Sequence, residues 1–254
     1  MILSNNKFFR ALDFSKNNSF SYIFICDHAT NIIPKYLKNL GLNDKQLVSH
    51  IAWDIGAKEV TIKLAKDLNC PCSFSNFSRL FIDPNRSKRS FESIVSSQEG
   101  HNIPGNQNIN ISDFKNRLNY HYNYHKNLKS FIAKYRERNK KFTLVSVHSF
   151  NQKYLNEFRS FDVGILYNSN NVNLALKMFD FFEKNNISYG NNYPYSGFFY
   201  NFTLDLHCHN KIENICVELR NDLIMNKKGI DKWSEILKMA LNSYDKKQKV
   251  KNSN

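Results

Sequence analysis

The sequence lacks the features of a secreted or membrane-spanning protein. No run of about 18 apolar residues occurs, and residues 1–18 contain no apolar core of signal-peptide length. The cysteines are odd in number and without paired CxxC spacing, which argues against a disulfide framework or a structural zinc knuckle. They are Cys26, Cys70, Cys72, Cys208 and Cys216. We therefore expect a soluble, cytoplasmic protein from a reducing compartment, with no membrane partner.

Glycine (8) and proline (5) are also scarce, whereas Asn, Lys, Ile, Phe and Tyr are abundant. This bias resembles an AT-rich coding background, and the basic residues behind the net charge of +14 are scattered. The charge is therefore weak evidence for a nucleic-acid partner, although it could help to gather an anionic substrate. With 254 residues, 41% of them hydrophobic, the chain can bury a sizeable core.

Strand-like and helix-like segments alternate along the chain. Strands are predicted at 22–28, 70–77, 144–150, 163–167 and 215–220. Helices are predicted at 43–68 with some interruption at Gly56, at 112–138, at 172–183 and around 233–244. This alternation predicts a single α/β/α three-layer domain over residues 1–245, with a mostly parallel central sheet. The Lys- and Asn-rich residues 246–254 are expected to form a disordered tail.

Polar residues follow the apolar strands, where α/β sheets place their sites. Asp27 and His28 end the first strand, and His148 and Ser149 lie at the end of the third. Imidazole is a common metal ligand and titrates near neutrality, so two strands that finish on histidine indicate one shared site. Either histidine could instead be a hydrogen-bonded structural residue. A long polar loop at 87–110 is expected to border this site, because such connections are uncommon unless functional or mobile.

Other candidate residues have structural alternatives. Glu218 lies in the middle of an apolar strand, where it could serve catalysis or form a buried ion pair with an arginine such as Arg220. Arg86 could recognise a carboxylate or be a solvated loop residue. His121 and His125 lie four apart on one helical face, a spacing that suits either metal chelation or simple packing.

Six motifs in chain order resemble those of the N-formylglutamate amidohydrolase family over nearly the whole length. They are CDHATN at 26–31, AWDIG at 52–56, SRLFIDPNR at 78–86, SVHSF at 146–150, NYPYS at 192–196 and VELRNDL at 217–223. Part of the set is also similar to the zinc carboxypeptidases, whose pattern runs from a histidine ligand through Asp-x-Asn-Arg and His-Ser to Glu-Leu-Arg. The resemblance implies a zinc carboxypeptidase-like fold and a zinc-dependent hydrolase.

The same resemblance assigns roles to individual residues. It implies that His28 and His148 are ligands of Zn²⁺ or another divalent metal and that Glu218 is general base and acid. Where the carboxypeptidase pattern has a glutamate ligand this chain has Asn31, whose neutral amide is a poor zinc ligand. Asp54 is our candidate for the missing ligand, although it could instead cap the following helix. Asp27 and His125 are alternative ligands.

The implied reaction is hydrolysis of the amide of a small anionic N-acyl amino acid, most simply N-formyl-L-glutamate to formate and L-glutamate. Asn85 and Arg86 would grip a substrate carboxylate by resemblance, and the full set of candidate substrate-binding residues is Arg79, Asn85, Arg86, Ser149, His207 and Arg220. Another N-acyl amino acid or a short peptide is an alternative substrate. A basic binding protein on a degenerate hydrolase fold is the alternative outside the enzyme class. If one metal joins the two histidines, their rings should lie within about 5 Å.

Overall fold

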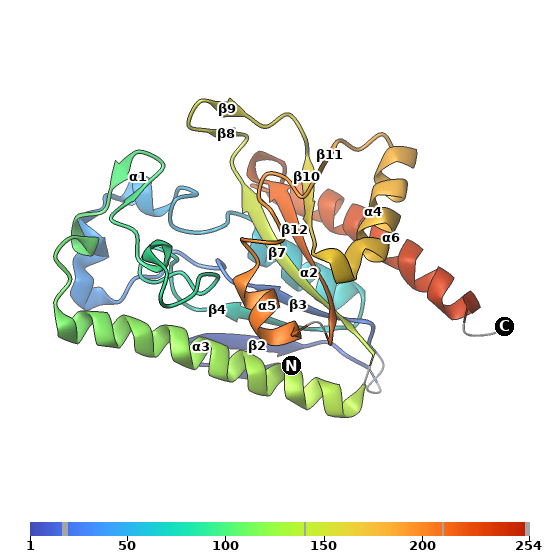
Figure 1. Ribbon diagram of the computed structural model, residues 1–254, viewed down its shortest axis with the longest axis horizontal. Coiled ribbons are helices and arrows are strands. Elements are labelled where there is room, and N and C mark those ends of the chain that lie inside the picture. Colours follow the sequence, from blue (N-terminus) through green and yellow to red (C-terminus); the bar gives the residue numbers. More distant parts are fainter. Residues whose placement is uncertain (17–19, 140, 210, 252–254) are drawn as a thin grey trace.

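The computed structural model describes residues 1–16, 20–139, 141–209 and 211–251, with side chains as far as residue 244. Its main strands are β1 (Ile2–Asn5), β2 (Phe9–Asp13), β3 (Tyr22–Cys26), β4 (Pro71–Ser75), β7 (Thr143–Phe150), β10 (Val163–Leu166), β11 (Tyr189–Asn191) and β12 (Glu213–Arg220). They form one eight-stranded sheet in the order β1-β2-β4-β3-β7-β12-β10-β11 (Figure 1). Two short hairpins lie outside this sheet, β5 (Ser97–Gln98) with β6 (His101–Asn102) and β8 (Lys153–Tyr154) with β9 (Glu157–Phe158).

The centre of the sheet is parallel. β3 pairs in parallel with β4 and β7, β7 pairs in parallel with β12, and β10 does so with β11. The pairs β1–β2, β2–β4 and β10–β12 are antiparallel. Every residue of β3, β4 and β7 is buried, as expected for strands covered on both faces. The predicted mostly parallel sheet is therefore confirmed.

Helices cover both faces of the sheet, which confirms the predicted three layers. α2 (Ala57–Asp67), α4 (Val172–Lys184) and α6 (Lys227–Lys251) pack together on one face. On the other face lie α3 (Ile111–Arg138) and α5 (Phe202–Cys208) (Figure 1). The ring of His125 on α3 stacks on that of His207 on α5. No helix in the described part of the chain combines the length and apolar character that crossing a membrane requires. All five cysteines are buried.

Two predicted helical boundaries differ in the structure. The helix expected at 43–68, with an interruption at Gly56, is two separate helices: α1 (Asp44–Leu47), which begins with a capping box between Asn43 and Gln46, and α2, which begins after Gly56. The residues between these helices turn toward the sheet edge. At the other end, α6 continues to Lys251 and so enters the predicted tail, whose residues 252–254 lie outside the described residues. The remaining connections contain the 3₁₀ turns η1 (Lys35–Gly41), η2 (Phe91–Ser93), η3 (Pro104–Asn106), η4 (Ser169–Asn171) and η5 (Asn221–Leu223).

Candidate functional site

The adjacent parallel strands β3 and β7 bring His28 and His148 to the same edge of the sheet. His28 follows the end of β3 at Cys26, and His148 lies within β7, near its carboxyl end. Their ring centroids are 4.9 Å apart in an edge-to-face arrangement, and both side chains are buried. The separation meets the limit of about 5 Å expected for two ligands of one metal.

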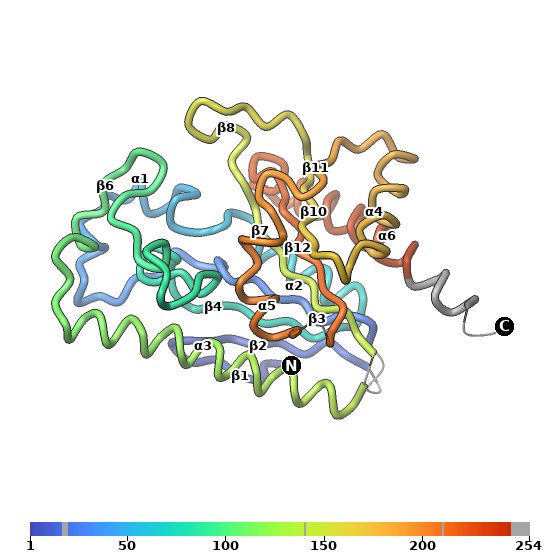
Figure 2. Tube along the Cα trace, in the orientation of Figure 1, coloured from blue at the N-terminus to red at the C-terminus, as the bar shows by residue number. Residues whose placement is uncertain are grey.

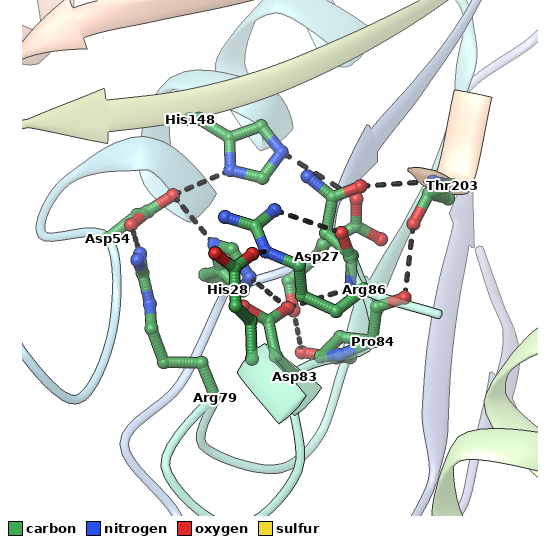
Figure 3. A network of polar contacts seen from close by, with 12 residues as sticks. Asp27, His28, Asp54, Arg79, Asp83, Pro84, Arg86, His148 and Thr203 are labelled. Atoms are coloured by element: carbon green, nitrogen blue, oxygen red, sulfur yellow. Dashed lines mark hydrogen bonds and ion pairs between the residues drawn. The ribbon is translucent and has the colours of Figure 1, made fainter. Parts of the chain in front are cut away.

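Asp54 lies against both imidazoles (Figure 3). Its Oδ2 is 3.3 Å from Nδ1 of His28 and 2.8 Å from Nδ1 of His148. Its backbone N–H donates to the His28 carbonyl at 2.9 Å, which holds the turn before α2 against the end of β3. The N-cap of α2 is Gly56, with no side-chain capping bond. Of the two roles considered for Asp54, helix capping is therefore not the one that the structure shows.

A second carboxylate faces the far side of each imidazole. Nε2 of His28 lies 2.7 Å from Oδ1 of Asp83, and Nε2 of His148 lies 3.6 Å from Oδ2 of Asp27 (Figure 3). The hydroxyl of Tyr124, on α3, donates to the other oxygen of Asp27. Histidines that bind metals commonly direct their second ring nitrogen to such a carboxylate, which fixes the tautomer and the ring orientation.

In the neutral state of His28, two hydrogen-bond acceptors face each other: Nδ1 of His28 and Oδ2 of Asp54. Burial and the nearby charge of Arg79 lower the pKa of His28 to about 4, so its imidazole is neutral at pH 7. With the ring proton on Nε2, facing Asp83, its Nδ1 presents a lone pair to the Asp54 carboxylate. Two acceptors in contact repel each other unless a cation lies between them.

One ligand atom each from His28, Asp54 and His148 lies within 4.8 Å of the others, close enough to share a metal ion. Two imidazole nitrogens and one carboxylate oxygen are a donor set that suits zinc and similar divalent metals. Within the described residues no other group of three His, Cys, Asp or Glu side chains meets this condition. The residues present therefore fit a divalent metal.

Glu218 lies beside this cluster because β12 pairs in register with β7, so that Glu218 is opposite His148. Its side chain is buried, and Oε2 has no hydrogen-bond partner among the residues that the structure describes. Burial raises the pKa of the Glu218 carboxyl, although the charges of His148 and Arg79 oppose this shift. A raised pKa makes the carboxylate a stronger base for the proton of an attacking water.

The ion-pair alternative for Glu218 is not what the structure shows. Arg220 instead pairs with Asp162 at 3.0 Å and with Asp222 at 2.8 Å. Its expected role in substrate binding also needs correction, because Arg220 does not line the cavity over the histidines. The acidic partners at the end of β12 already occupy its guanidinium.

A polar cavity of about 460 Å³ lies over the cluster. Its lining includes the predicted residues His28, Asp54, Arg79, Asn85, Arg86, His148, Ser149 and Glu218. The loop at 87–110 contributes Glu92, Val95 and Gln98, which confirms that it borders the site. Further walls come from the β8–β9 hairpin, which extends beyond the carboxyl end of β7 (Figure 2), and from residues 194–200.

Predicted substrate-binding residues on the cavity wall also make structural bonds. Asn85 accepts from the backbone N–H of Thr203 at 3.0 Å and donates to the Tyr200 carbonyl at 3.1 Å, so it fixes the start of α5. Arg86 pairs with Glu92 at 2.9 Å, and its guanidinium lies 5.0 Å from the Tyr200 ring centroid. The Ser149 hydroxyl donates to the Ile55 carbonyl at 3.1 Å.

Three histidines hold the loop at 83–86 from behind. Nε2 of His121 lies 2.9 Å from the Arg86 carbonyl, and Nε2 of His125 lies 2.9 Å from the Pro84 carbonyl. His207, which we expected to bind substrate, stacks on His125 with its Nε2 3.0 Å from Nδ1 of that ring. Since none of the three lines the cavity, the expectation for His207 needs correction: it supports the loop through His125.

Arg159 also lines the cavity and is 3% exposed, but it was not among the residues predicted from the sequence. It follows the β8–β9 hairpin, outside all six motifs. The sequence gives little indication of this role, because a surface arginine in the connection between β7 and β10 could have the same local sequence.

Gly56 is needed to form the turn that carries Asp54. Its φ is +79°, and a Cβ atom at this position would lie 2.2 Å from the Ile224 carbonyl oxygen. We expect Gly56→Ala to lower the free energy of unfolding, measured in urea, by more than about 1–2 kcal/mol. Gly100→Ala is the matched control, since Gly100 has the same φ of +79° but open space around its Cβ. Equal losses in the two variants would contradict a role for the Ile224 contact.

Comparisons with known proteins agree with the motifs. The model of the N-formylglutamate amidohydrolase family matches residues 20–225, a range that contains all six motifs. The crystal structure of a gene product from Agrobacterium tumefaciens is similar with a TM-score of 0.87 and 27% identity, covering 96% of this chain and 97% of that one. The N-formylglutamate amidohydrolase from Ralstonia eutropha has the same fold, with a TM-score of 0.72 and 13% identity over 94% of this chain and 98% of its own. A sequence search among curated proteins finds no match.

Proposed function

This chain belongs to the N-formylglutamate amidohydrolase family, and we propose that it hydrolyses the amide bond of an N-acyl amino acid, most simply N-formyl-L-glutamate. The products would be formate and L-glutamate. The observation that carries the proposal is the convergence of His28, Asp54 and His148 beside the buried carboxyl group of Glu218 at one cavity.

His28, Asp54 and His148 would hold the divalent metal, with Zn²⁺ as our first candidate. When bound, such a metal polarises an amide carbonyl and lowers the pKa of a water to about 7. The guanidinium of Arg79 contacts Oδ1 of Asp54 and leaves Oδ2 for the two imidazoles. Asp83 keeps the His28 ring oriented through its other nitrogen.

Glu218 would move the proton that the reaction requires. Its carboxylate takes a proton from the attacking water and returns it to the leaving nitrogen, as amide hydrolysis needs both steps. The rigid strand β12 holds this carboxyl group next to the metal ligands, and its Oε2 is free to accept.

Three arginines on the cavity wall could bind an anionic substrate, among carboxylates that include the metal-site residue Asp54 and the proposed general base Glu218. Arg79, Arg86 and Arg159 all contribute to the cavity lining, although the basic residues of the chain as a whole are scattered. A guanidinium is planar and permanently charged, so it binds a carboxylate through two parallel hydrogen bonds. A dicarboxylate such as N-formyl-L-glutamate matches this lining.

We expect Arg86→Ala to raise KM for N-formyl-L-glutamate by about 10- to 100-fold with little change in metal content. The substitution removes a charge-assisted contact to the substrate, whereas Arg86 contacts none of the three metal ligands directly. Steady-state kinetics and metal analysis measure the two effects. Arg89→Ala is the control, because Arg89 is exposed in the same loop. An unchanged KM in folded Arg86→Ala would make Arg86 a structural loop residue.

The proposed function is tested by a metal assay on the purified protein together with a panel of formyl-, acetyl- and succinyl-amino acids. We expect one divalent ion per chain and the highest kcat/KM for N-formyl-L-glutamate. Higher activity on another acyl group would select the alternative N-acyl substrate. Binding of these compounds without turnover, in protein supplied with Zn²⁺, would indicate a binding protein and contradict the proposal.

A further inference from the structure

Arg159 is buried on the cavity wall without an ionic partner. Its Nε has no hydrogen-bond partner, and Nη1 reaches only the Tyr195 hydroxyl, at 3.4 Å. It forms no ion pair with any carboxylate of the described residues. The contrast is Arg117, also buried, which bonds to Asp113 at 2.9 Å and to three further oxygen atoms. The guanidinium of Arg117 is therefore hydrogen-bonded within the protein, whereas that of Arg159 has donors without a protein partner among the described residues.

Aromatic rings surround the Arg159 guanidinium. Its central carbon lies 4.8 Å from the ring centroid of Tyr154, 5.1 Å from that of Tyr195 and 5.8 Å from that of Phe150. Such contacts stabilise a cation but replace only part of its lost hydration, and an unpaired buried charge is costly. The environment therefore orients the guanidinium and leaves its donors available for an anion.

Arg159 and Arg86 occupy separate positions in the cavity. Arg86 lies over the ring of Tyr200, and Arg159 lies over that of Tyr195. These two rings are neighbours, with centroids 5.9 Å apart. The backbone N–H of Arg159 donates to the Gln152 carbonyl at 2.8 Å, which fixes it at the base of the β8–β9 hairpin. Besides Arg79, which contacts Asp54, the cavity thus presents two cationic positions from two different segments of the chain.

We propose that Arg159 binds the side-chain carboxylate of the substrate and makes the site selective for N-acyl derivatives of acidic amino acids. Arg86 then remains for the α-carboxylate. This inference rests on the proposed function for the identity of the reaction, but the carboxylate receptor can be tested without turnover. It also gives Arg159 the role that the sequence had suggested for Arg220.

The kinetic test compares N-formyl-L-glutamate with N-formyl-L-glutamine, which has nearly the same size but lacks the side-chain charge. In Arg159→Met we expect kcat/KM for the glutamate compound to fall by about 10- to 150-fold, while the value for the glutamine compound changes by less than about threefold. Arg136→Met, which removes an exposed charge from α3, should leave both values unchanged. Equal losses on both substrates, or a preserved preference for glutamate, would overturn the proposal.

A binding test separates this inference from the reaction. Glutarate should raise the thermal midpoint of the wild-type protein more than butyrate does, and Arg159→Met should abolish that difference. If the difference is lost but no N-formyl compound is hydrolysed by the wild type, the receptor stands and the proposed reaction fails. If the difference persists in the variant, the receptor fails whatever the activity.

Stability without ligand distinguishes a receptor from a structural arginine. Because Arg159 lacks an ionic partner, Arg159→Met should keep or raise the thermal midpoint of the ligand-free protein, whereas loss of a structural arginine would lower it. Arg159→Gln, which keeps a polar side chain near Tyr195, is measured in parallel and should show the same loss of glutamate preference. A Gln variant with the wild-type preference would contradict the assignment.

Discussion

Replacing Glu218 with glutamine is expected to lower kcat by about 10²–10⁴ while metal content and substrate binding persist. The amide keeps the size of the side chain but cannot accept the proton of the attacking water. Glu218 is buried with a raised pKa and an unbonded Oε2, and its strand neighbours Val217 and Leu219 have no group that could accept the proton. The measurement is kcat per folded, metal-loaded molecule.

Glu213→Gln is the matched control, because it makes the same change on the same strand. Glu213 accepts from the Thr143 hydroxyl at 2.5 Å and from the Tyr244 hydroxyl, and it does not line the cavity. We expect this control to lose stability without losing turnover per folded molecule. If Glu218→Gln behaves in the same way, with a lower thermal midpoint and near wild-type kcat, Glu218 has no part in the proton transfer.

Loss of the metal should abolish turnover, and His148→Ala should lose the metal. The substitution removes one of two imidazoles that face Asp54, and even partners behind the ligands change metal affinity by about 10- to 100-fold. We therefore expect metal affinity to fall by more than about 100-fold in His148→Ala. Elemental analysis after dialysis measures this loss, and a chelator followed by Zn²⁺ should remove and restore the activity of the wild-type protein.

Two further variants serve as comparisons for this metal prediction, one with a smaller expected loss of metal affinity and one with none. Asp83→Asn weakens only the group behind His28, so its loss of metal affinity should be smaller, within about 10- to 100-fold. His101→Ala removes an exposed histidine from the β5–β6 hairpin and should bind metal as the wild type does. Full metal content in His148→Ala, or full turnover in the presence of excess chelator, would refute the metal centre.

The order of the central strands along the chain and the three layers were predictable from the sequence. Continuous apolar runs such as Tyr22–Cys26 and Thr143–Phe150 are typical of strands buried on both faces, and their alternation with helical periodicity indicates parallel pairing. At 43–68 the sequence indicated an interruption at Gly56 but not its extent, since α1 ends at Leu47 and the backbone turns with a positive φ at Gly56 before α2 begins. The carbonyl of Ile224, distant in the sequence, lies where a Cβ atom at residue 56 would be, so the turn requires glycine there.

The sequence by itself determined which residues of the site stand at strand ends. His28, His148 and Glu218 belong to short motifs within or directly after strands, and strand pairing alone brings them to one sheet edge. The sequence did not decide whether Asp54 is the third metal ligand or a helix cap. Asp54 is 26 residues from His28 and 94 from His148, so its position relative to them depends on the fold. Only the course of the turn before α2 decided that its carboxylate faces both rings.

Tertiary structure also decided which arginines face the cavity. Arg220 and Arg159 carry the same charge, but Asp162 and Asp222 pair with the first, whereas aromatic rings surround the second, which forms no ion pair with a carboxylate of the described residues. A guanidinium on a long side chain can serve as a structural ion pair or as a ligand receptor, and the sequence around it does not distinguish the two. The choice depends on which side chains from distant segments pack against it, because those neighbours set its hydration and its available donors.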